Sequence, residues 1–173
     1  MAEALDPAIP ADIERLAQEV LQAACDRELM LATAESCTGG LLASLLTDIP
    51  GKSHAFERGF VTYSDAAKRE VLGVPATILA TDGAVSEAAA RAMADGALAA
   101  SRANLAVSIT GFAEVAPEGP AGLVHFACAR RGGPTAHRIE HFGDVGRAEV
   151  RLCALRVGLA LFRQGLADRA RAA

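Results

Sequence analysis

The chain has 173 residues, a hydrophobic content of 51% and a net charge of −4 at pH 7, which suits one domain over residues 1–173 with its core at about 12–167. Its acidic balance, with no basic cluster larger than Arg130-Arg131, argues against a nucleic-acid partner. No uncharged run approaches the roughly eighteen residues that span a bilayer, so no membrane partner is expected.

Apolar periodicity and turn residues predict a chain in which helices and strands alternate. Residues 10–27 have helical spacing, with Asp12 placed to cap the helix. A buried strand over 29–34 precedes a helix over 38–47 that opens on two glycines. The further elements expected, in chain order, are a strand over 59–63, helices over 65–73, 75–80 and 86–101, strands over 105–110, 123–130 and 135–142, and a helix over 147–167.

The order of these elements indicates the fold class. Strands separated by helices favour parallel pairing, and the late hairpin around Gly132-Gly133 adds antiparallel strands. We therefore predict an α/β fold, a three-layer α/β/α sandwich with a mixed sheet and helices on both faces. A homo-oligomer is also expected, for which helix 86–101 offers a face of small residues, although that face would serve internal packing equally well.

The N-terminal segment and the cysteines bear on the compartment. Residues 1–10 are acidic and lack the basic-then-apolar order of a signal peptide, so we expect a cytoplasmic protein. No cysteine pair has CxxC spacing, which favours reduced thiols over a zinc or redox motif. The cysteines are Cys25, Cys37, Cys128 and Cys153.

The turn over residues 33–40 is the strongest candidate for a site. It joins a predicted buried strand to a predicted helix, the position at which α/β proteins place ligands. It carries hydroxyl, thiol and carboxylate side chains, of which Ser36 is a potential nucleophile. The N–H groups of Thr38, Gly39 and Gly40 lie at the helix start, where they can bind an anion or an oxyanion.

The only tyrosine and one of only two lysines follow the next predicted strand. If the two strands are neighbours, Tyr63 and Lys68 meet Ser36 at one sheet edge. A partly desolvated lysine beside the Tyr63 hydroxyl can accept the serine proton, because burial lowers the lysine pKa, so Ser36, Tyr63 and Lys68 are the predicted catalytic residues. This arrangement suits hydrolysis of an amide or ester, whereas the alternative is that Ser36 and Thr38 only cap a helix and Lys68 is a solvated charge.

The segment His137 to His141 matches H-x-x-E-H, a zinc-protease pattern that requires a helix. Here it lies in a segment with strand propensity, where the two histidines would be about 13 Å apart and too distant to share one metal. We therefore predict no metal site.

Several motifs, in this order, resemble the CinA C-terminal domain family, that of the competence/damage-inducible CinA-like proteins. The similarity covers roughly residues 12–167. The matching segments are Ala34-Glu35-Ser36-Cys37-Thr38-Gly39-Gly40, Phe56-Glu57-Arg58-Gly59-Phe60-Val61-Thr62-Tyr63-Ser64, Lys68, Leu72-Gly73-Val74, Gly83-Ala84-Val85-Ser86 and Val107-Ser108-Ile109-Thr110-Gly111.

The resemblance implies an enzyme that hydrolyses the carboxamide of nicotinamide mononucleotide to nicotinic acid mononucleotide and ammonia, in pyridine nucleotide recycling. It implies no cofactor and a small nucleotide substrate. Ser36, Tyr63 and Lys68 fall on the family's serine, tyrosine and lysine. Thr110 and Arg147 fall on positions associated with substrate binding, and Arg147 would suit the 5′-phosphate through a forked contact.

The chain departs from the family pattern after Thr110-Gly111. The family usually continues with Ile-Ala-Gly-Pro, a glycine-rich loop and a Lys-Pro-Val-Gly, but here the glycine run and the lysine are missing. Glu114 and Glu118 bring negative charge that should repel a phosphate. Two alternatives follow: the altered loop over 111–122 has shifted the substrate to another amide, or the chain is a non-catalytic paralogue that acts as a binding module.

Overall fold

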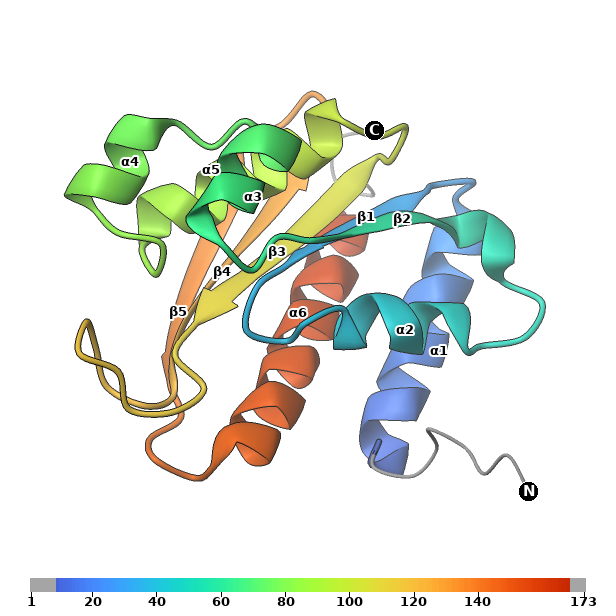
Figure 1. The fold of residues 1–173 in the computed structure, drawn as a ribbon. Helices are drawn as coiled ribbons and strands as arrows, with labels where there is room; N and C mark the ends of the chain where they lie inside the picture. Colours follow the sequence, from blue (N-terminus) through green and yellow to red (C-terminus); the bar gives the residue numbers. More distant parts are fainter. Residues whose placement is uncertain (1–8, 169–173) are drawn as a thin grey trace, which may run out of the picture.

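The computed structural model describes residues 9–168. Most of the segment 1–10, on which the signal-peptide prediction depends, therefore lies outside the described residues. Five strands form one mixed sheet in the order β2-β1-β3-β4-β5 (Figure 1). The pairings of β1 with β2 and β3 are parallel, and those of β4 with β3 and β5 are antiparallel. The strands are β1 (Leu31–Glu35), β2 (Phe56–Val61), β3 (Leu105–Gly111), β4 (Leu123–Arg130) and β5 (Ala136–His141).

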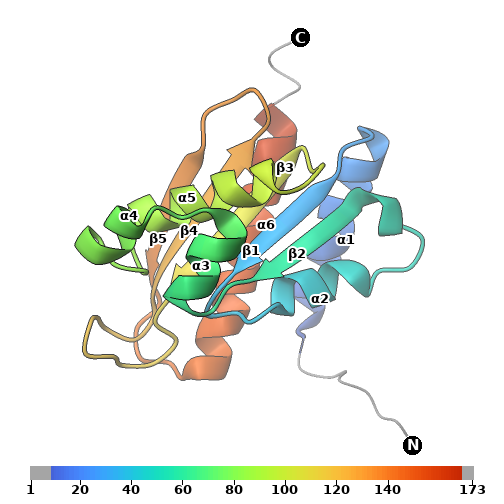
Figure 2. The same ribbon diagram turned by 45° about the horizontal axis from the view of Figure 1, so that its top comes forward.

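Helices cover both faces of this sheet, which confirms the predicted three-layer α/β/α sandwich (Figures 1 and 2). One face carries α1 (Ala11–Asp26), α2 (Leu41–Thr47) and α6 (Arg147–Asp168). The other carries α3 (Asp65–Leu72), α4 (Ala76–Thr81) and α5 (Glu87–Ala99). A short 3₁₀ turn, η1 (Ser53–Ala55), lies in a segment predicted to be a loop.

Strand β3 shows how the sequence divides the core between the two faces. Its Leu105, Val107 and Ile109 pack with α1 and α6 in the larger apolar cluster. Small side chains alternate with them and face α5, where the Ser108 hydroxyl donates to the Ala90 carbonyl at 2.6 Å. The large side chains on one face of β3 and the small side chains on the other therefore set how closely each helix layer approaches the sheet.

The alanine-rich helix α5 uses its small-residue face inside the molecule. Ala90, Met93, Ala94 and Ala97 are fully buried against the sheet and α3. Gly96 lies so close to α3 that a Cβ there would be 1.9 Å from the Leu72 carbonyl oxygen. Internal packing thus accounts for this composition, and homo-oligomerisation stays a prediction.

The helix boundaries agree with the local signals except at the starts of α1 and α2, since the helix predicted from residue 38 begins at Leu41, after Gly40 at φ 92°. Ser64 caps α3 by accepting from the Ala67 amide, and Gly73 ends it at φ 65°. The predicted cap by Asp12 is wrong: Pro10 occupies that position without a side-chain hydrogen bond, and Asp12 bonds Arg156 of α6 at 2.8 Å. Within residues 9–168, no helix has the length and hydrophobicity that crossing a membrane requires.

Candidate active site

Ser36 lies at the carboxyl edge of three parallel strands, directly after β1. Its amide donates to the Ile109 carbonyl of β3 at 3.0 Å, and the Thr62 amide donates to the Glu35 carbonyl at 2.9 Å. These bonds continue the strand registers by one residue, so Ser36 has Thr62 on one side and Thr110 on the other. The nucleophile candidate is therefore held by the sheet itself.

Lys68 reaches Ser36 from the first turns of α3. Its Nζ lies 3.1 Å from Ser36 Oγ, 2.9 Å from the Thr62 carbonyl oxygen and 3.1 Å from the Tyr63 carbonyl oxygen. The side chains of Ser36 and Lys68 are almost enclosed, with relative exposures of 8% and 1%. Because burial penalises the charged amine, the pKa of Lys68 is lowered from its ordinary value of 10.5.

The three oxygens around Lys68 Nζ can accept the three donors of an ammonium, and the same contacts also suit the neutral amine. An uncharged amine has two N–H donors and one lone pair. The carbonyl groups of Thr62 and Tyr63 accept two donors. The lone pair is then directed at Ser36 Oγ, whose hydroxyl can donate to it. Because burial also lowers the pKa of Lys68, this geometry is compatible with an amine that accepts the Ser36 proton.

A buried carboxylate organises the turn after Ser36. Glu35 is fully buried and accepts the Thr38 hydroxyl at 2.7 Å and the amides of Gly40, Leu42 and Ala43 at 3.2, 3.1 and 2.8 Å. These bonds satisfy amides at the start of α2 that have no partner within the helix. The sequence analysis assigned Glu35 no role, although an acid between a buried strand and a glycine turn is a recognisable signal for one.

The glycine amides predicted to bind an oxyanion have other acceptors. The Gly40 amide donates to Glu35, and the Gly39 amide donates to the Ser36 carbonyl at 3.0 Å. Within residues 9–168, the Thr38 amide has no protein acceptor, whereas the Cys37 amide is directed at its own thiol. Of the three predicted amides, that of Thr38 is thus the one without a protein acceptor, and the residue itself is fully buried.

Arg151 of α6 is a second residue that the sequence analysis missed. Its guanidinium donates to the Thr38 carbonyl at 2.7 Å and lies 3.6 Å from the Cβ that a side chain at Gly39 would have. It therefore ties the turn to α6 across the core face. Burial raises the pKa of the adjacent Cys37 thiol to about 11, so this thiol stays protonated at neutral pH.

The remaining predicted residues take different positions. Tyr63 contributes its carbonyl to Lys68, but its side chain is 69% exposed. Thr110 is buried and its hydroxyl donates to the Ala84 carbonyl at 2.7 Å. Arg147 begins α6 and forms an ion pair with Glu114. The structure thus joins Ser36 and Lys68 directly and places the aromatic ring of Tyr63 and the Arg147 guanidinium further out.

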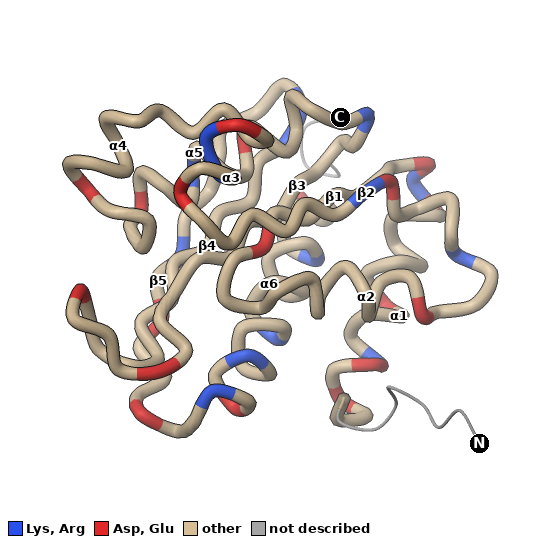
Figure 3. The backbone as a smooth tube through the Cα atoms, in the orientation of Figure 1, with Lys and Arg blue, Asp and Glu red and all other residues tan. Residues whose placement is uncertain are grey.

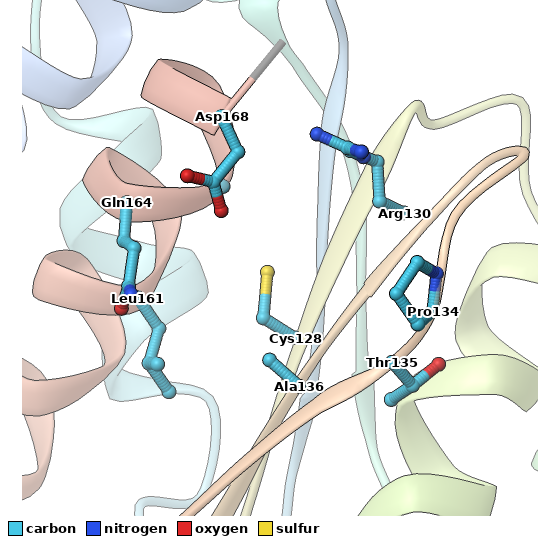
Figure 4. A pocket seen from close by; sticks show the side chains of 9 residues that line it. Cys128, Arg130, Pro134, Thr135, Ala136, Leu161, Gln164 and Asp168 are labelled. Atoms are coloured by element: carbon cyan, nitrogen blue, oxygen red, sulfur yellow. The ribbon is translucent and has the colours of Figure 1, made fainter. Parts of the chain in front are cut away.

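A cavity of about 210 Å³ lies next to this pair. Cys37, Tyr63 and Arg147 line it together with residues 111–117, and Ser36 and Lys68 are not among its lining residues. A second cavity, of about 160 Å³, lies between β4, β5 and the end of α6, where Arg130, Asp168 and the Cys128 thiol surround it (Figure 4). It contains none of the predicted site residues.

The H-x-x-E-H segment forms β5, as the strand prediction required. His137 Nε2 lies 3.0 Å from His125 Nδ1 of β4, and burial lowers the pKa of both imidazoles. Among the described residues, no cluster of three or more His, Cys, Asp or Glu side chains has the geometry of a metal site.

The fold and this site define a class: an α/β/α protein with a buried serine–lysine pair at the carboxyl edge of its parallel strands. Comparison with known proteins then identifies the family. The model of the CinA C-terminal domain matches residues 13–166, so the chain belongs to that family.

Individual relatives agree with this assignment. The nicotinamide-nucleotide amidohydrolase PncC of Escherichia coli strain K12 is 48% identical over 140 residues, covering 78% of this chain and 84% of the relative. A CinA-like protein of Akkermansia muciniphila is 54% identical over 112 residues, or 63% of this chain, yet the chain spans only 27% of its length. The crystal structure of the competence/damage-inducible protein CihA from Agrobacterium tumefaciens superposes with a TM-score of 0.88 at 46% identity, covering 92% of this chain and 98% of that one.

Proposed function

We propose that this protein is an amidohydrolase that cleaves the carboxamide of nicotinamide mononucleotide to nicotinic acid mononucleotide and ammonia. The observation that carries this proposal is the contact of 3.1 Å between Lys68 Nζ and Ser36 Oγ, with the other donors of the amine bound to two carbonyl groups. The relationship to the E. coli amidohydrolase supports the choice of substrate class.

In the proposed mechanism, Ser36 Oγ attacks the carboxamide carbon while the neutral Lys68 amine takes the hydroxyl proton. In this proposal the oxyanion forms beside the turn, where the buried Thr38 amide has no protein acceptor and would donate to it. The Lys68 ammonium then gives its proton to the departing nitrogen, and ammonia leaves an ester on Ser36. Water attacks the ester, Lys68 accepts the water proton and returns it to Ser36 Oγ, and the acid is released.

Thr62 and Tyr63 act in this mechanism through their backbone. Their carbonyl oxygens hold Lys68 Nζ in one position, so the lone pair stays aligned with Ser36 during both proton transfers. The Tyr63 ring and the Arg147 guanidinium line the adjacent cavity, where they would contact the substrate rather than the reacting atoms. No metal or cofactor enters this mechanism, since every proton transfer uses groups of the chain.

The test is ammonia release from nicotinamide mononucleotide by the purified protein and by Ser36→Ala. We expect the wild type to release ammonia and the variant to lose that activity with an unchanged thermal unfolding curve. Ser44→Ala is the matched control, because Ser44 is exposed on α2 and its hydroxyl lies outside the site.

Two outcomes would contradict the proposal. Full activity in Ser36→Ala would exclude the serine nucleophile. Nucleotide binding with no ammonia release, at enzyme concentrations close to those of the substrate, would instead favour the non-catalytic alternative.

A further inference from the structure

The cavity beside Ser36 contains one basic and one acidic side chain, and they bind each other. Arg147 and Glu114 are its only charged lining residues, and the Arg147 guanidinium donates to the Glu114 carboxylate. Figure 3 shows where charged residues lie along the chain: the first turns of α6 carry basic residues beside an acidic one, and the loop between β3 and β4 carries acidic residues. The site's one candidate phosphate ligand therefore already has an anionic partner.

The loop holds Glu114 in place. Its base is closed by hydrogen bonds from the Phe112 amide to the Leu123 carbonyl at 2.9 Å and from the Gly122 amide to the Phe112 carbonyl at 2.7 Å. Its tip is closed by reciprocal bonds between Ala116 and Gly119. The Phe112 ring packs over the tip, since a Cβ at Gly119 would be 2.4 Å from that ring. Glu114 lies between these two closures.

Charge at Glu114 opposes a phosphate in two ways. It occupies the guanidinium that would otherwise form a forked contact with phosphate oxygens, and it repels a dianion at short range. A substrate without a phosphate meets neither obstacle. Both side chains of the ion pair are about half exposed or more, so water and salt weaken the pair and a bound phosphate can displace it.

We propose that Glu114 is a specificity-determining residue that occupies Arg147 and lowers the preference of the site for a phosphorylated nucleotide over the corresponding nucleoside. The proposal rests on the proposed function, because it concerns the substrate of that same site. The sequence that replaces the glycine-rich segment thereby has a physical effect: it supplies a carboxylate that competes with a phosphate for Arg147.

The experiment compares Glu114→Gln with Glu118→Gln. Both variants remove one negative charge from the same loop, but Glu118 makes no ion pair in the described part of the chain. The readout is kcat/KM for nicotinamide mononucleotide divided by kcat/KM for nicotinamide riboside. We expect Glu114→Gln to raise this ratio roughly three- to tenfold, mainly through a lower KM for the nucleotide, and Glu118→Gln to leave it within about twofold.

A second readout separates this proposal from the proposed function. Binding of inorganic phosphate, followed by calorimetry or ³¹P NMR, requires no turnover and should tighten in Glu114→Gln alone. If no variant releases ammonia but phosphate binding tightens in this way, the amidohydrolase proposal fails and the role of Glu114 stands. If the wild type turns over the nucleotide and the two variants show equal ratios and equal phosphate affinity, the role of Glu114 is overturned.

Discussion

The turn over residues 35–40 and the loop over residues 112–122 border the same site but are built in opposite ways. In the turn, Glu35 is fully buried and every bond to its carboxylate comes from the turn or the start of α2. In the loop, Glu114 is exposed and its bond reaches across to α6. The difference teaches that the proposed reacting groups are held by the core, whereas the residue proposed to select the substrate is a side chain in contact with water.

The two regions also differ in what a substitution can disturb. A buried hydrogen-bonded charge leaves several groups without partners when it is removed, and the cost is large. An exposed ion pair contributes little to stability, so its loss changes recognition more than folding. Four further experiments test this contrast, from the largest expected effect to the smallest.

The largest effect is expected from Lys68→Met, which fills the same buried space but cannot accept a proton. Loss of a positioned base should lower kcat for ammonia release by about 10²- to 10⁴-fold. Lys68→Arg should not restore activity, because a guanidinium stays protonated. Lys52→Met, at the only other lysine, should retain wild-type kcat; if Lys68→Met does so too, Lys68 is not the base.

The pH profile gives the next largest change. A base acts when it is unprotonated, and burial lowers the pKa of Lys68, so activity should rise with pH by up to about tenfold per unit and level off below pH 10.5. The same profile measured on Glu118→Gln should level off at the same pH, because that residue lies in the exposed loop. A rate that falls over this range would show that the protonated amine is the active form.

Glu35→Gln tests the turn through its stability. The substitution keeps the shape but removes the charge and places an NH₂ group among backbone donors. We expect a loss of about 2 kcal/mol, and therefore a Tm lower by about 4–8 °C in thermal unfolding. Glu70→Gln, on the exposed side of α3, is the matched control and should leave Tm unchanged. An unchanged Tm for Glu35→Gln would refute the organising role of this carboxylate.

The smallest effect is expected from Val115→Ser at the tip of the loop. Val115 is 69% exposed, and substitutions at such positions usually change stability by no more than about 0.5 kcal/mol. Tm should stay within about 2 °C of wild type. If Tm fell as much as in Glu35→Gln, the loop would belong to the cooperatively folded core. The contrast between the buried turn and the exposed loop would then be wrong.

Much of the fold was predictable because its signals are local. The cap at Ser64, the left-handed Gly73 and the alternation of large and small residues in β3 are each carried by a few neighbouring residues. The Ser36–Lys68 contact was predictable with one added assumption, that β1 and β2 are parallel neighbours. Their carboxyl ends then bring the turn after β1 and the helix after β2 to one edge of the sheet.

The remainder depended on partners distant in the chain. Asp12 pairs with Arg156, 144 residues away, which overrode its local capping signal. The Gly40 amide is a local exception: it was expected to be free because Glu35, five residues earlier, was not assigned as its acceptor. The negative charge of Glu114 was read from the sequence, but its pairing with Arg147 required the three-dimensional arrangement.

The closed base of the loop has a consequence for how such proteins diversify. The bonds between Phe112 and residues 122–123 fasten both ends of the segment to β3 and β4, so its interior can change in length or composition at little cost in closure entropy. Segments from other family members should therefore be exchangeable between these anchors without refolding the sheet. If the proposed function holds, exchange of this one loop would alter the substrate while the serine–lysine pair stays unchanged.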